Sequence, residues 1–385
     1  MKKLLSIVLI AVFLVSCAPA ATPAGGPAAG NPSAPASGGE VVIGVSAPLT
    51  GNYAEYGQLW KRAMDMAVEE INTQKVLGDQ TLRLQYEDSQ SDPKQSATIA
   101  KKLAGDPKVV AVIGDFSSSA SLAGAPIYLS AKKVQLSPTA SDPKFSLTGD
   151  YMFSIVGSQK AEAPFLAKHV VQDMGKKNIA VMYINNDWGS VTKDIFVESA
   201  QSQGAAIVEE QAFLDTDKDF RAVLTRLQAK NPDVLFVAGF YQQVSLLQKQ
   251  RQDLGWEVPV VTPSSTYSPE LIKQGGAAVE GQQLVAVFFP TAADPKVQDF
   301  VKNYKARYNS DPNQFAALAY DAVWLLASTI AKTGSEPTAI RDGLANDAAG
   351  FVGVTGPMKF NEDRLVAKNY VPLEVQGGQF QLVQP

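Results

Sequence analysis

Hydrophobic positions after residue 40 alternate between two periods along the chain. Short apolar runs such as residues 41–45 and 109–114 are rich in valine and isoleucine, as expected of strands covered on both faces of a parallel sheet. Between such runs, apolar residues recur at spacings of three and four, as at Leu59, Ala63 and Met66, which predicts amphipathic helices. The regular alternation of strand and helix predicts an α/β fold with parallel sheets.

The alternation falls into two blocks that meet near Gly157. The strands expected in the first block cover residues 41–45, 82–87, 109–114, 134–137 and 151–156. Those expected in the second block cover residues 178–183, 206–213, 234–237 and 258–261. Each block suffices for one doubly wound lobe, so the sequence predicts two such lobes. The chain beyond residue 284 is too short for a third domain, so the lobes must share it, and the repeated crossings make a multi-strand hinge.

The amino-terminal residues have the pattern of a signal peptide. Lys2 and Lys3 precede an apolar stretch over residues 4–15, which is too short to span a membrane and has the length of a signal-peptide core. The stretch leads into Leu-Val-Ser-Cys, which looks like a bacterial lipobox ending at Cys17. An ordinary secretory peptide with a chance cysteine is the alternative. Cys17 is the sole cysteine of the chain and stands where a lipobox requires one, so residues 1–17 are interpreted as a lipoprotein signal peptide with Cys17 as the lipid anchor.

Residues 18–39 consist almost entirely of alanine, proline, glycine, serine and threonine. Without larger apolar side chains they cannot form a core, so we expect a disordered tether. The protein is then exported and held by lipid at the outer face of the cell membrane, in the periplasm or at the cell surface. The lipid is expected to be its only membrane contact.

The composition of the remaining chain argues against several kinds of chemistry. The net charge of −4 over 385 residues gives no reason to expect a nucleic-acid partner. His169 is the only histidine and Cys17 precedes the folded part, so the usual zinc sites and Cys–His pairs are excluded. The sequence contains no phosphate-binding glycine loop and no serine nucleophile motif. We therefore expect a protein that is not an enzyme and that binds neither a metal nor a cofactor.

Two hydroxyl-rich loops follow strands at the edge where open α/β sheets bind ligands. Ser117 and Ser118 come soon after the strand over residues 109–114, and Thr139 and Ser141 follow the next strand. Hydroxyls combined with free backbone N–H groups at a helix start make a site for a carboxylate. The same hydroxyls could instead only cap their own helices, and the residue types favour neither interpretation.

These loops belong to a series of segments that resembles the Leu/Ile/Val-binding family of type I periplasmic solute-binding proteins of ABC transporters. The segments, in chain order, are VVIGVSAPLTGNYAEYG, EDSQSDPKQSATIAKKL, AVIGDFSSSASLAGAPIY, LSPTASDP, YINNDWG, PDVLFVAGF and AYDAV. Each is loose by itself, but their order and spacing across residues 40–385 are highly specific. The resemblance implies an N-lobe of residues 40–157 and 284–355 and a C-lobe of residues 158–283 and 356–385.

The resemblance also implies a ligand site. Ser118, Thr139 and Ser141 match positions that bind the ligand's α-carboxylate, and Ser117 and Ala140 are expected to add main-chain contacts in the same loops. The residues at positions that wall the side-chain pocket are Tyr56, Phe116, Trp188 and Phe240 or Tyr241.

Two positions depart from the family pattern. Where some members have a disulfide, this chain has Ser91 and Ser117. Where amino-acid binders hold an acid for the α-ammonium, it has Ser264, which we keep as a ligand-binding position although a buried ammonium without a counter-charge is costly. The acids in neighbouring loops that could serve instead are Asp115, Asp187 and Asp321. For an amino-acid ligand, Ser264→Glu is expected to keep or tighten binding.

The function implied by the resemblance is the capture of a small molecule between two closing lobes, by a monomer that delivers it to ABC permease subunits. The favoured ligand is an amino acid with a branched or other apolar side chain. An apolar or aromatic carboxylate is the alternative within transport, and Ser264 would suit it. A ligand sensor of the same fold, which signals to a partner, is the alternative from another class.

The lipid anchor can be tested at Cys17. Cys17→Ser should release a soluble or unprocessed protein, because the chain has no other thiol to carry the lipid. Ligand affinity should stay unchanged, because the expected tether separates the anchor from the ligand site. Membrane fractionation of cells that express each form makes the test, and membrane retention of the variant would show that the lipoprotein interpretation is wrong.

Overall fold

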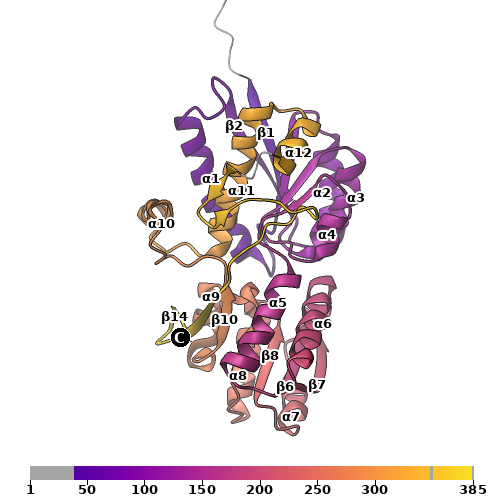
Figure 1. Ribbon diagram of the computed structural model, residues 1–385, viewed down its shortest axis with the longest axis vertical. Coiled ribbons are helices and arrows are strands. Elements are labelled where there is room, and N and C mark those ends of the chain that lie inside the picture. Colours follow the sequence, from indigo (N-terminus) through magenta and orange to yellow (C-terminus); the bar gives the residue numbers. More distant parts are fainter. Residues whose placement is uncertain (1–38, 347–349, 384–385) are drawn as a thin grey trace, which may run out of the picture. The chain divides into compact units, whose positions relative to one another are not determined.

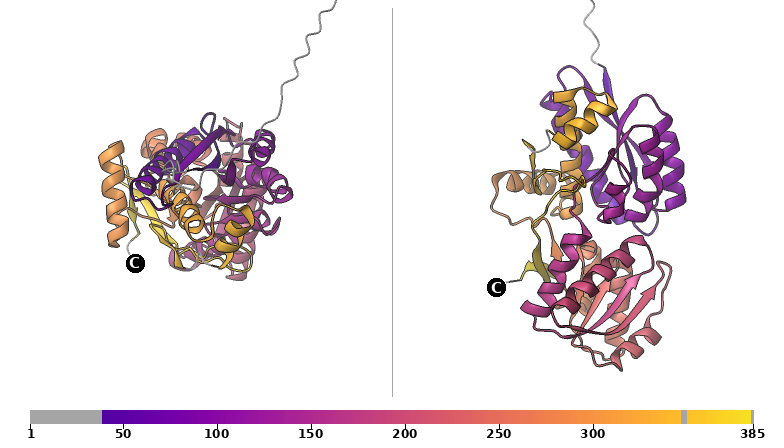
Figure 2. Two further views of the ribbon diagram at one scale, coloured as in Figure 1. Left: turned by 90° about the horizontal axis from the view of Figure 1, so that it is seen from above. Right: turned by 45° about the vertical axis from the view of Figure 1, so that its right-hand side comes forward.

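The computed structural model describes residues 39–346 and 350–383. The expected signal peptide, Cys17 and all but the last residue of the expected tether lie outside the described residues. The folded chain is built from two twisted sheets, each flanked by its own helices, as the views in Figure 1 and Figure 2 show. The predicted fold class, with two doubly wound α/β lobes, is confirmed.

The first sheet has five parallel strands in the order β2-β1-β3-β4-β5. The bounds of its strands are β1 Glu40–Ala47, β2 Thr81–Asp88, β3 Val109–Gly114, β4 Val134–Ser137 and β5 Met152–Ser154. The helices that connect them are α1 Ala54–Thr73, α2 Pro93–Gly105, α3 Ser118–Ser130 and α4 Pro143–Leu147. Seven of the eight residues of β1 are buried, which explains its continuous apolar pattern.

The second sheet has seven strands in the order β14-β13-β10-β9-β8-β6-β7. Its parallel strands are β6 Asn178–Ile184, β7 Ala206–Phe213, β8 Val234–Ala238, β9 Val260–Thr262 and β10 Gln283–Ala286. The hairpin of β13 Val371–Gln376 and β14 Gln379–Leu382 pairs antiparallel beside β10. The helices of this part are α5 Gln159–Lys168, α6 Asp187–Ser202, α7 Arg221–Gln228, α8 Tyr241–Asp253 and α9 Pro269–Gly275.

Between β10 and β13 the chain returns to the first sheet. This segment contains α10 Pro295–Tyr308, α11 Gln314–Thr333, α12 Pro337–Asn346 and the short pair β11 Val352–Gly353 and β12 Gly356–Pro357. Helix α11 packs along α1 and is long and apolar enough to cross a membrane, but 78% of its apolar window is buried inside the protein. It is therefore the core helix of the first lobe.

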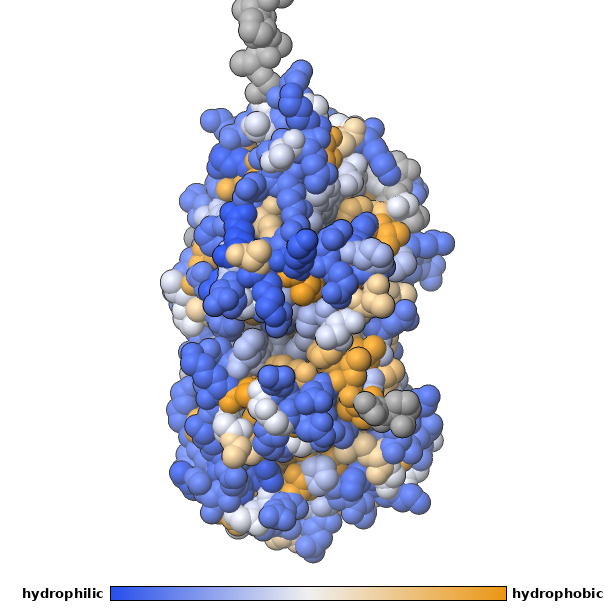
Figure 3. All heavy atoms as spheres, turned by 90° about the vertical axis from the view of Figure 1, so that its left-hand side faces the viewer, coloured by the Kyte–Doolittle hydropathy of each residue, from blue (hydrophilic) through white to orange (hydrophobic). Residues whose placement is uncertain are grey.

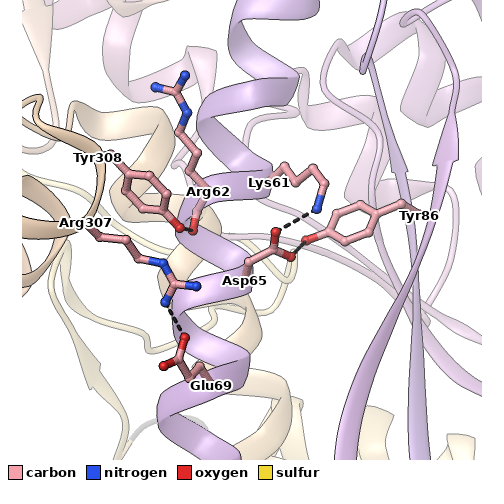
Figure 4. Close-up of polar contacts among 7 residues, drawn as sticks. All are labelled: Lys61, Arg62, Asp65, Glu69, Tyr86, Arg307 and Tyr308. Carbon is pink, nitrogen blue, oxygen red and sulfur yellow. Dashed lines mark hydrogen bonds and ion pairs between the residues drawn. The ribbon is translucent and has the colours of Figure 1, made fainter.

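Helix α10 is attached to α1 by polar contacts near its end. Arg307 forms an ion pair with Glu69, and the Tyr308 hydroxyl donates to the Arg62 carbonyl at 2.7 Å (Figure 4). The guanidinium groups of Arg62 and Arg307 both lie within 6 Å of the centre of the Tyr308 ring. Mainly hydrophilic residues cover the face that carries α10 and the C-terminal hairpin (Figure 3).

The lobe boundaries differ from the predicted ones at two places. Strand β10 pairs with β9 and β13, so it belongs to the second sheet and not to the N-lobe segment expected from residue 284. Leu365 forms a bridge with Ser154 of the first sheet, although residues 356–385 were expected in the C-lobe. Both differences arise from hydrogen bonding between segments distant in sequence, which the local pattern of apolar residues does not reveal.

A buried carboxylate on α11 holds the turn between β11 and β12. Asp321 on α11 accepts hydrogen bonds from the Val354 and Thr355 backbone N–H groups, each at 2.8 Å, and from the Thr355 hydroxyl at 2.7 Å. Lys368 donates to the Thr355 hydroxyl at 2.7 Å, and burial lowers the pKa of this lysine to about 8, against the opposing effect of Asp321. Asp321 is therefore a structural residue that holds the β11–β12 turn against α11.

A close approach between α1 and the loop after β1 positions the start of α1. A Cβ atom at Gly57 would lie 1.9 Å from the Pro48 carbonyl oxygen, far inside contact distance. Only glycine therefore allows this approach, which places the neighbouring Tyr56 against Phe116, shortly after β3.

Gly57→Ala should therefore lower the free energy of unfolding, by about 1–3 kcal/mol as for other overpacked sites. Gly105→Ala is the matched control, because a Cβ atom at Gly105 would meet nothing within 4 Å. Urea denaturation of both variants measures the difference. Equal stability of the two variants would contradict the proposed constraint.

Candidate functional site

A cavity lies where the carboxyl ends of strands from both sheets meet. Its lining residues are Phe116, Ser117, Ser118, Thr139, Ser141, Val156, Gln159, Glu162, Trp188, Phe240, Ser264, Ser265, Gln314 and Phe315. Eight of the eleven ligand-binding residues expected from the sequence are among them, and the remaining three are Tyr56, Ala140 and Tyr241.

The hydroxyl side of the cavity comes from the loops after β3 and β4. Ser117 caps α3, which begins at Ser118, so the first N–H groups of this helix have no partner within it. The Ser118 hydroxyl accepts from the Asp142 N–H at 3.2 Å and keeps its own hydrogen for another partner. The Thr139 hydroxyl instead donates to the Phe116 carbonyl at 2.7 Å. The Ser141 hydroxyl accepts from the Gln159 amide and from the Trp188 indole N–H. Ser118 and Ser141 can thus donate to a ligand, whereas the Thr139 hydroxyl hydrogen is already used.

The aromatic side of the cavity is a layered cluster. Phe116 stacks on Tyr56 with ring centres 4.3 Å apart, and Trp188 lies 5.0 Å from Phe240. Tyr56 is fully buried behind this wall, where its hydroxyl donates to the Ser265 carbonyl at 2.6 Å and lies 3.4 Å from the Tyr241 N–H.

Tyr56 and Tyr241 therefore support the wall from behind. Ala140 lies behind the hydroxyl side in the same way, with its N–H donating to the Ser137 hydroxyl at 2.8 Å and its carbonyl accepting from the Ser154 hydroxyl at 2.6 Å. Both of its backbone polar groups are used within the first lobe.

The sequence analysis missed six of the lining residues, which are Val156, Gln159, Glu162, Ser265, Gln314 and Phe315. Of these, Glu162 on α5 carries the only carboxylate among the lining residues. Its side chain is only 3% exposed and lines the cavity. One carboxylate oxygen accepts from the Ser264 N–H at 2.7 Å and the other from the Gln159 amide at 2.8 Å. Burial raises the pKa of Glu162, while the hydrogen bonds from Ser264 and Gln159 act in the opposite direction. Among the described residues no cationic side chain forms an ion pair with it.

A sequence signal for Glu162 does exist. It stands four residues before Leu166 on α5 and seven before His169, which directly follows α5, and both of these residues are buried on the same helical face. An acid at a buried position of an amphipathic helix needs a hydrogen-bonding or cationic partner. Such a position is a candidate for a binding site.

The three acids considered from the sequence lie elsewhere. Asp115 accepts from the hydroxyls of Ser46, Ser89 and Ser96 at 2.7–3.0 Å, which fixes it inside the first lobe. Asp187 is exposed at the start of α6, and Asp321 binds the turn between β11 and β12. None of the three lines the cavity.

The expected replacement of a disulfide by two serines has a simple structural counterpart. The Ser91 hydroxyl donates to the Ser117 hydroxyl at 2.9 Å, and it also accepts from the Ser117 N–H at 3.1 Å. The serine loop is thus held to the segment before α2 by hydrogen bonds.

Direct hydrogen bonds join the two lobes around the cavity. Besides Tyr56 and Ser265, they include the Tyr53 hydroxyl to Asp215 at 3.0 Å, the Asn52 amide to Asp215 at 3.4 Å and the Trp188 indole N–H to the Ser141 hydroxyl at 3.1 Å. Desolvation and the neighbouring Asp215 raise the pKa of Tyr53. This arrangement is that of a closed cleft.

Two doubly wound lobes that close over a cavity lined by hydroxyls, aromatic rings and one carboxylate define a solute-binding protein of the two-lobed α/β class. The family model described as periplasmic binding protein matches residues 40–379, and the chain belongs to this family. The relatives that this chain matches confirm its resemblance to the Leu/Ile/Val-binding proteins.

One relative is the leucine-, isoleucine-, valine-, threonine-, and alanine-binding protein of Pseudomonas aeruginosa, 27% identical over 84% of this chain and 86% of its own length. The branched-chain amino acid transporter substrate-binding protein of Streptococcus pneumoniae, solved in complex with isoleucine, is 26% identical with a TM-score of 0.84 and covers 90% of this chain and 99% of its own. A solute-binding protein of an R. palustris ABC transporter, solved with benzoate, is 20% identical with a TM-score of 0.82 over 90% of this chain and 96% of its own, and shows the fold alone.

The position of Glu162 reverses the expectation for Ser264→Glu. The new acid would enter a buried cavity beside an existing carboxylate, and two like charges there raise the pKa of the pair. The variant should weaken amino-acid binding. As pH rises through the raised pKa of this carboxyl pair, the variant should become less stable than the wild type. Melting temperatures of both proteins at pH 5 and pH 7 measure this difference. Ser264→Gln, of the same size without charge, is the control and should show no such pH dependence.

Proposed function

We propose that this protein captures an amino acid with an apolar side chain outside the cytoplasm and delivers it to an ABC importer. The observation that carries the proposal is the buried carboxylate of Glu162, which faces the same cavity as the donor hydroxyls of Ser118 and Ser141. An α-amino acid presents a cation and an anion on neighbouring atoms and so complements both sides. The names of the Pseudomonas and Streptococcus relatives support the same ligand class.

The energetics require both polar ends of such a ligand. A micromolar complex needs about 8.2 kcal/mol, whereas burial of a leucine-sized side chain supplies only about 1.5–3 kcal/mol. Hydrogen bonds to charged groups contribute about 1.5–3 kcal/mol each. A buried carboxylate without a counter-charge is costly, and a ligand ammonium removes that cost at Glu162. We therefore assign the ammonium to Glu162 and the carboxylate to Ser118, Ser141 and the start of α3.

The aromatic wall is suited to the side chain of the ligand. Phe116, Trp188, Phe240 and Phe315 present ring faces and edges to the cavity and offer no charge. Tyr56, Tyr241, Ala140 and Thr139 are proposed to support the site, with Ser117 and Ser264 as wall residues. A branched aliphatic side chain matches this surface because it loses water without leaving a polar group unpaired.

An aromatic carboxylate is the second candidate, and the aromatic wall is the observation that favours it. Such a ligand would leave Glu162 facing an uncharged ring, so the glutamate would have to be protonated. The raised pKa of Glu162 lowers the cost of that state but does not remove it. The amino acid is therefore the preferred ligand.

The proposed delivery route follows the sequence pattern. Lipid anchoring at Cys17 would hold a monomer at the outer face of the membrane, near the permease subunits to which it delivers the ligand. A sensor role would use the same cleft with a different partner.

Glu162→Gln tests the assignment of the ammonium. It should weaken leucine binding at least tenfold, because the amide keeps the shape of the side chain but lacks its charge. Binding of the deaminated analogue 4-methylpentanoate should be kept or strengthened, because its carboxylate no longer meets a like charge. Calorimetric titration measures both ligands, and the exposed Glu198→Gln on α6 is the matched control. A wild type that prefers 4-methylpentanoate would overturn the amino-acid assignment.

The pH dependence of binding tests the same residue. Protonation of Glu162 competes with the ligand ammonium, and burial raises the pKa of this carboxyl. Leucine affinity of the wild type should therefore fall on acidification at a pH above the ordinary glutamate pKa of about 4.3. In Glu162→Gln this fall should disappear. A wild-type affinity that stays constant down to pH 4 would contradict the role of the carboxylate.

A further inference from the structure

Gln159, the first residue of α5, connects the two polar sides of the cavity. It is completely buried and lines the cavity. Its amide nitrogen donates to the Ser141 hydroxyl at 2.9 Å and to the Glu162 carboxylate at 2.8 Å. Both amide hydrogens are therefore used. The contact with the carboxylate also fixes the orientation of the amide, because the atom beside an ionised oxygen must be the donor.

The amide oxygen of Gln159 is left without a partner. Among the described residues no donor lies within hydrogen-bonding distance of this buried atom. A buried acceptor is normally satisfied, so the oxygen is suited to a donor on the ligand. It belongs to the same amide whose nitrogen binds Glu162, so a ligand ammonium at Glu162 would be within reach of both.

Ser141 is prepared in a complementary way. Its hydroxyl oxygen accepts from Gln159 at 2.9 Å and from the Trp188 indole N–H at 3.1 Å. A hydroxyl has two acceptor positions, and both are taken, so the group can only donate to a further partner. Ser141 belongs to the first lobe, whereas Gln159 and Trp188 belong to the second. The hydroxyl is therefore set as a donor only where the lobes meet.

We infer that Gln159 is the specificity-determining residue for a ligand that carries an ammonium and a carboxylate on one carbon. Its amide oxygen accepts an N–H of the ammonium beside Glu162, and its amide nitrogen turns Ser141 into a donor for the carboxylate. This inference rests on the proposed function, and it adds that one side chain links recognition of both charges to closure of the cleft.

Gln159→Met tests the inference, because methionine has a similar length but neither donates nor accepts strongly. Titrations with leucine, 4-methylpentanoate and 3-methylbutylamine give the affinity for both charges, for the carboxylate alone and for the ammonium alone. The variant should weaken leucine binding at least tenfold, and its ratio of leucine affinity to 4-methylpentanoate affinity should fall at least fivefold. The exposed Gln74→Met is the control and should change neither value.

Trp188→Phe separates the proposed contact of Gln159 with the ammonium from the orientation of the Ser141 hydroxyl. It removes one donor to Ser141 and leaves the Gln159 amide in place, so leucine and 4-methylpentanoate should weaken by the same factor. In a double-mutant cycle, Gln159→Met and Ser141→Ala should be less than additive for leucine, because each removes the same carboxylate donor. Thermal melting checks whether Gln159→Met lowers stability, and in that case Gln159→Leu replaces it in the same titrations.

The outcomes distinguish the two proposals. A wild type that binds 4-methylpentanoate better than leucine overturns the proposed function and the inference with it. A wild type that prefers leucine, with an unchanged preference in Gln159→Met, leaves the function standing and overturns the role of Gln159. Equal weakening of all three ligands would show that Gln159 only supports the fold of the site.

Discussion

All strands of the first sheet and five strands of the second run parallel within their sheet, and this direction governs where the protein can bind a ligand. Parallel strands connected by helices place their following loops at one edge. The loops after β3 and β4 and the starts of α3, α5 and α6 therefore converge on one cavity. Residues from position 116 to position 315 meet there only because both sheets present the same edge.

Three buried carboxylates show how the surroundings separate structural from functional acids. Asp115 is surrounded by three serine hydroxyls and a backbone N–H, and Asp321 accepts three hydrogen bonds with Lys368 nearby. Glu162 accepts two, lines a cavity and has no cationic partner among the described residues. Burial raises the pKa of all three, so the raised pKa does not distinguish them. The number of hydrogen-bond donors around each carboxylate and its contact with the cavity distinguish the functional acid from the structural ones.

The contacts between the lobes combine support of the cleft with preparation of the ligand site. Tyr53, Tyr56 and Trp188 each form a hydrogen bond across the cleft, and their rings belong to the same aromatic cluster. The chain also crosses between the lobes three times, after β5, after β10 and before β13, and these crossings hold the lobes together elsewhere. Closure of the lobes therefore positions the aromatic rings and the hydroxyl donors of the site at the same time.

The sequence by itself determined the fold class, the two serine loops and most of the cavity lining, because strand periodicity, hydroxyls after strands and family segments are local properties. Only the tertiary structure decided the sheet to which β10 and Leu365 belong, since that depends on pairing between distant segments. Only the tertiary structure also showed that Tyr56 and Tyr241 stand behind the wall and that the acid of the site is Glu162. With Ser264 in the expected place, the sequence offered only Asp115, Asp187 and Asp321 as acids for the site. A sequence does not show that α5, which follows the first crossing between the lobes, brings the Glu162 carboxylate to that point.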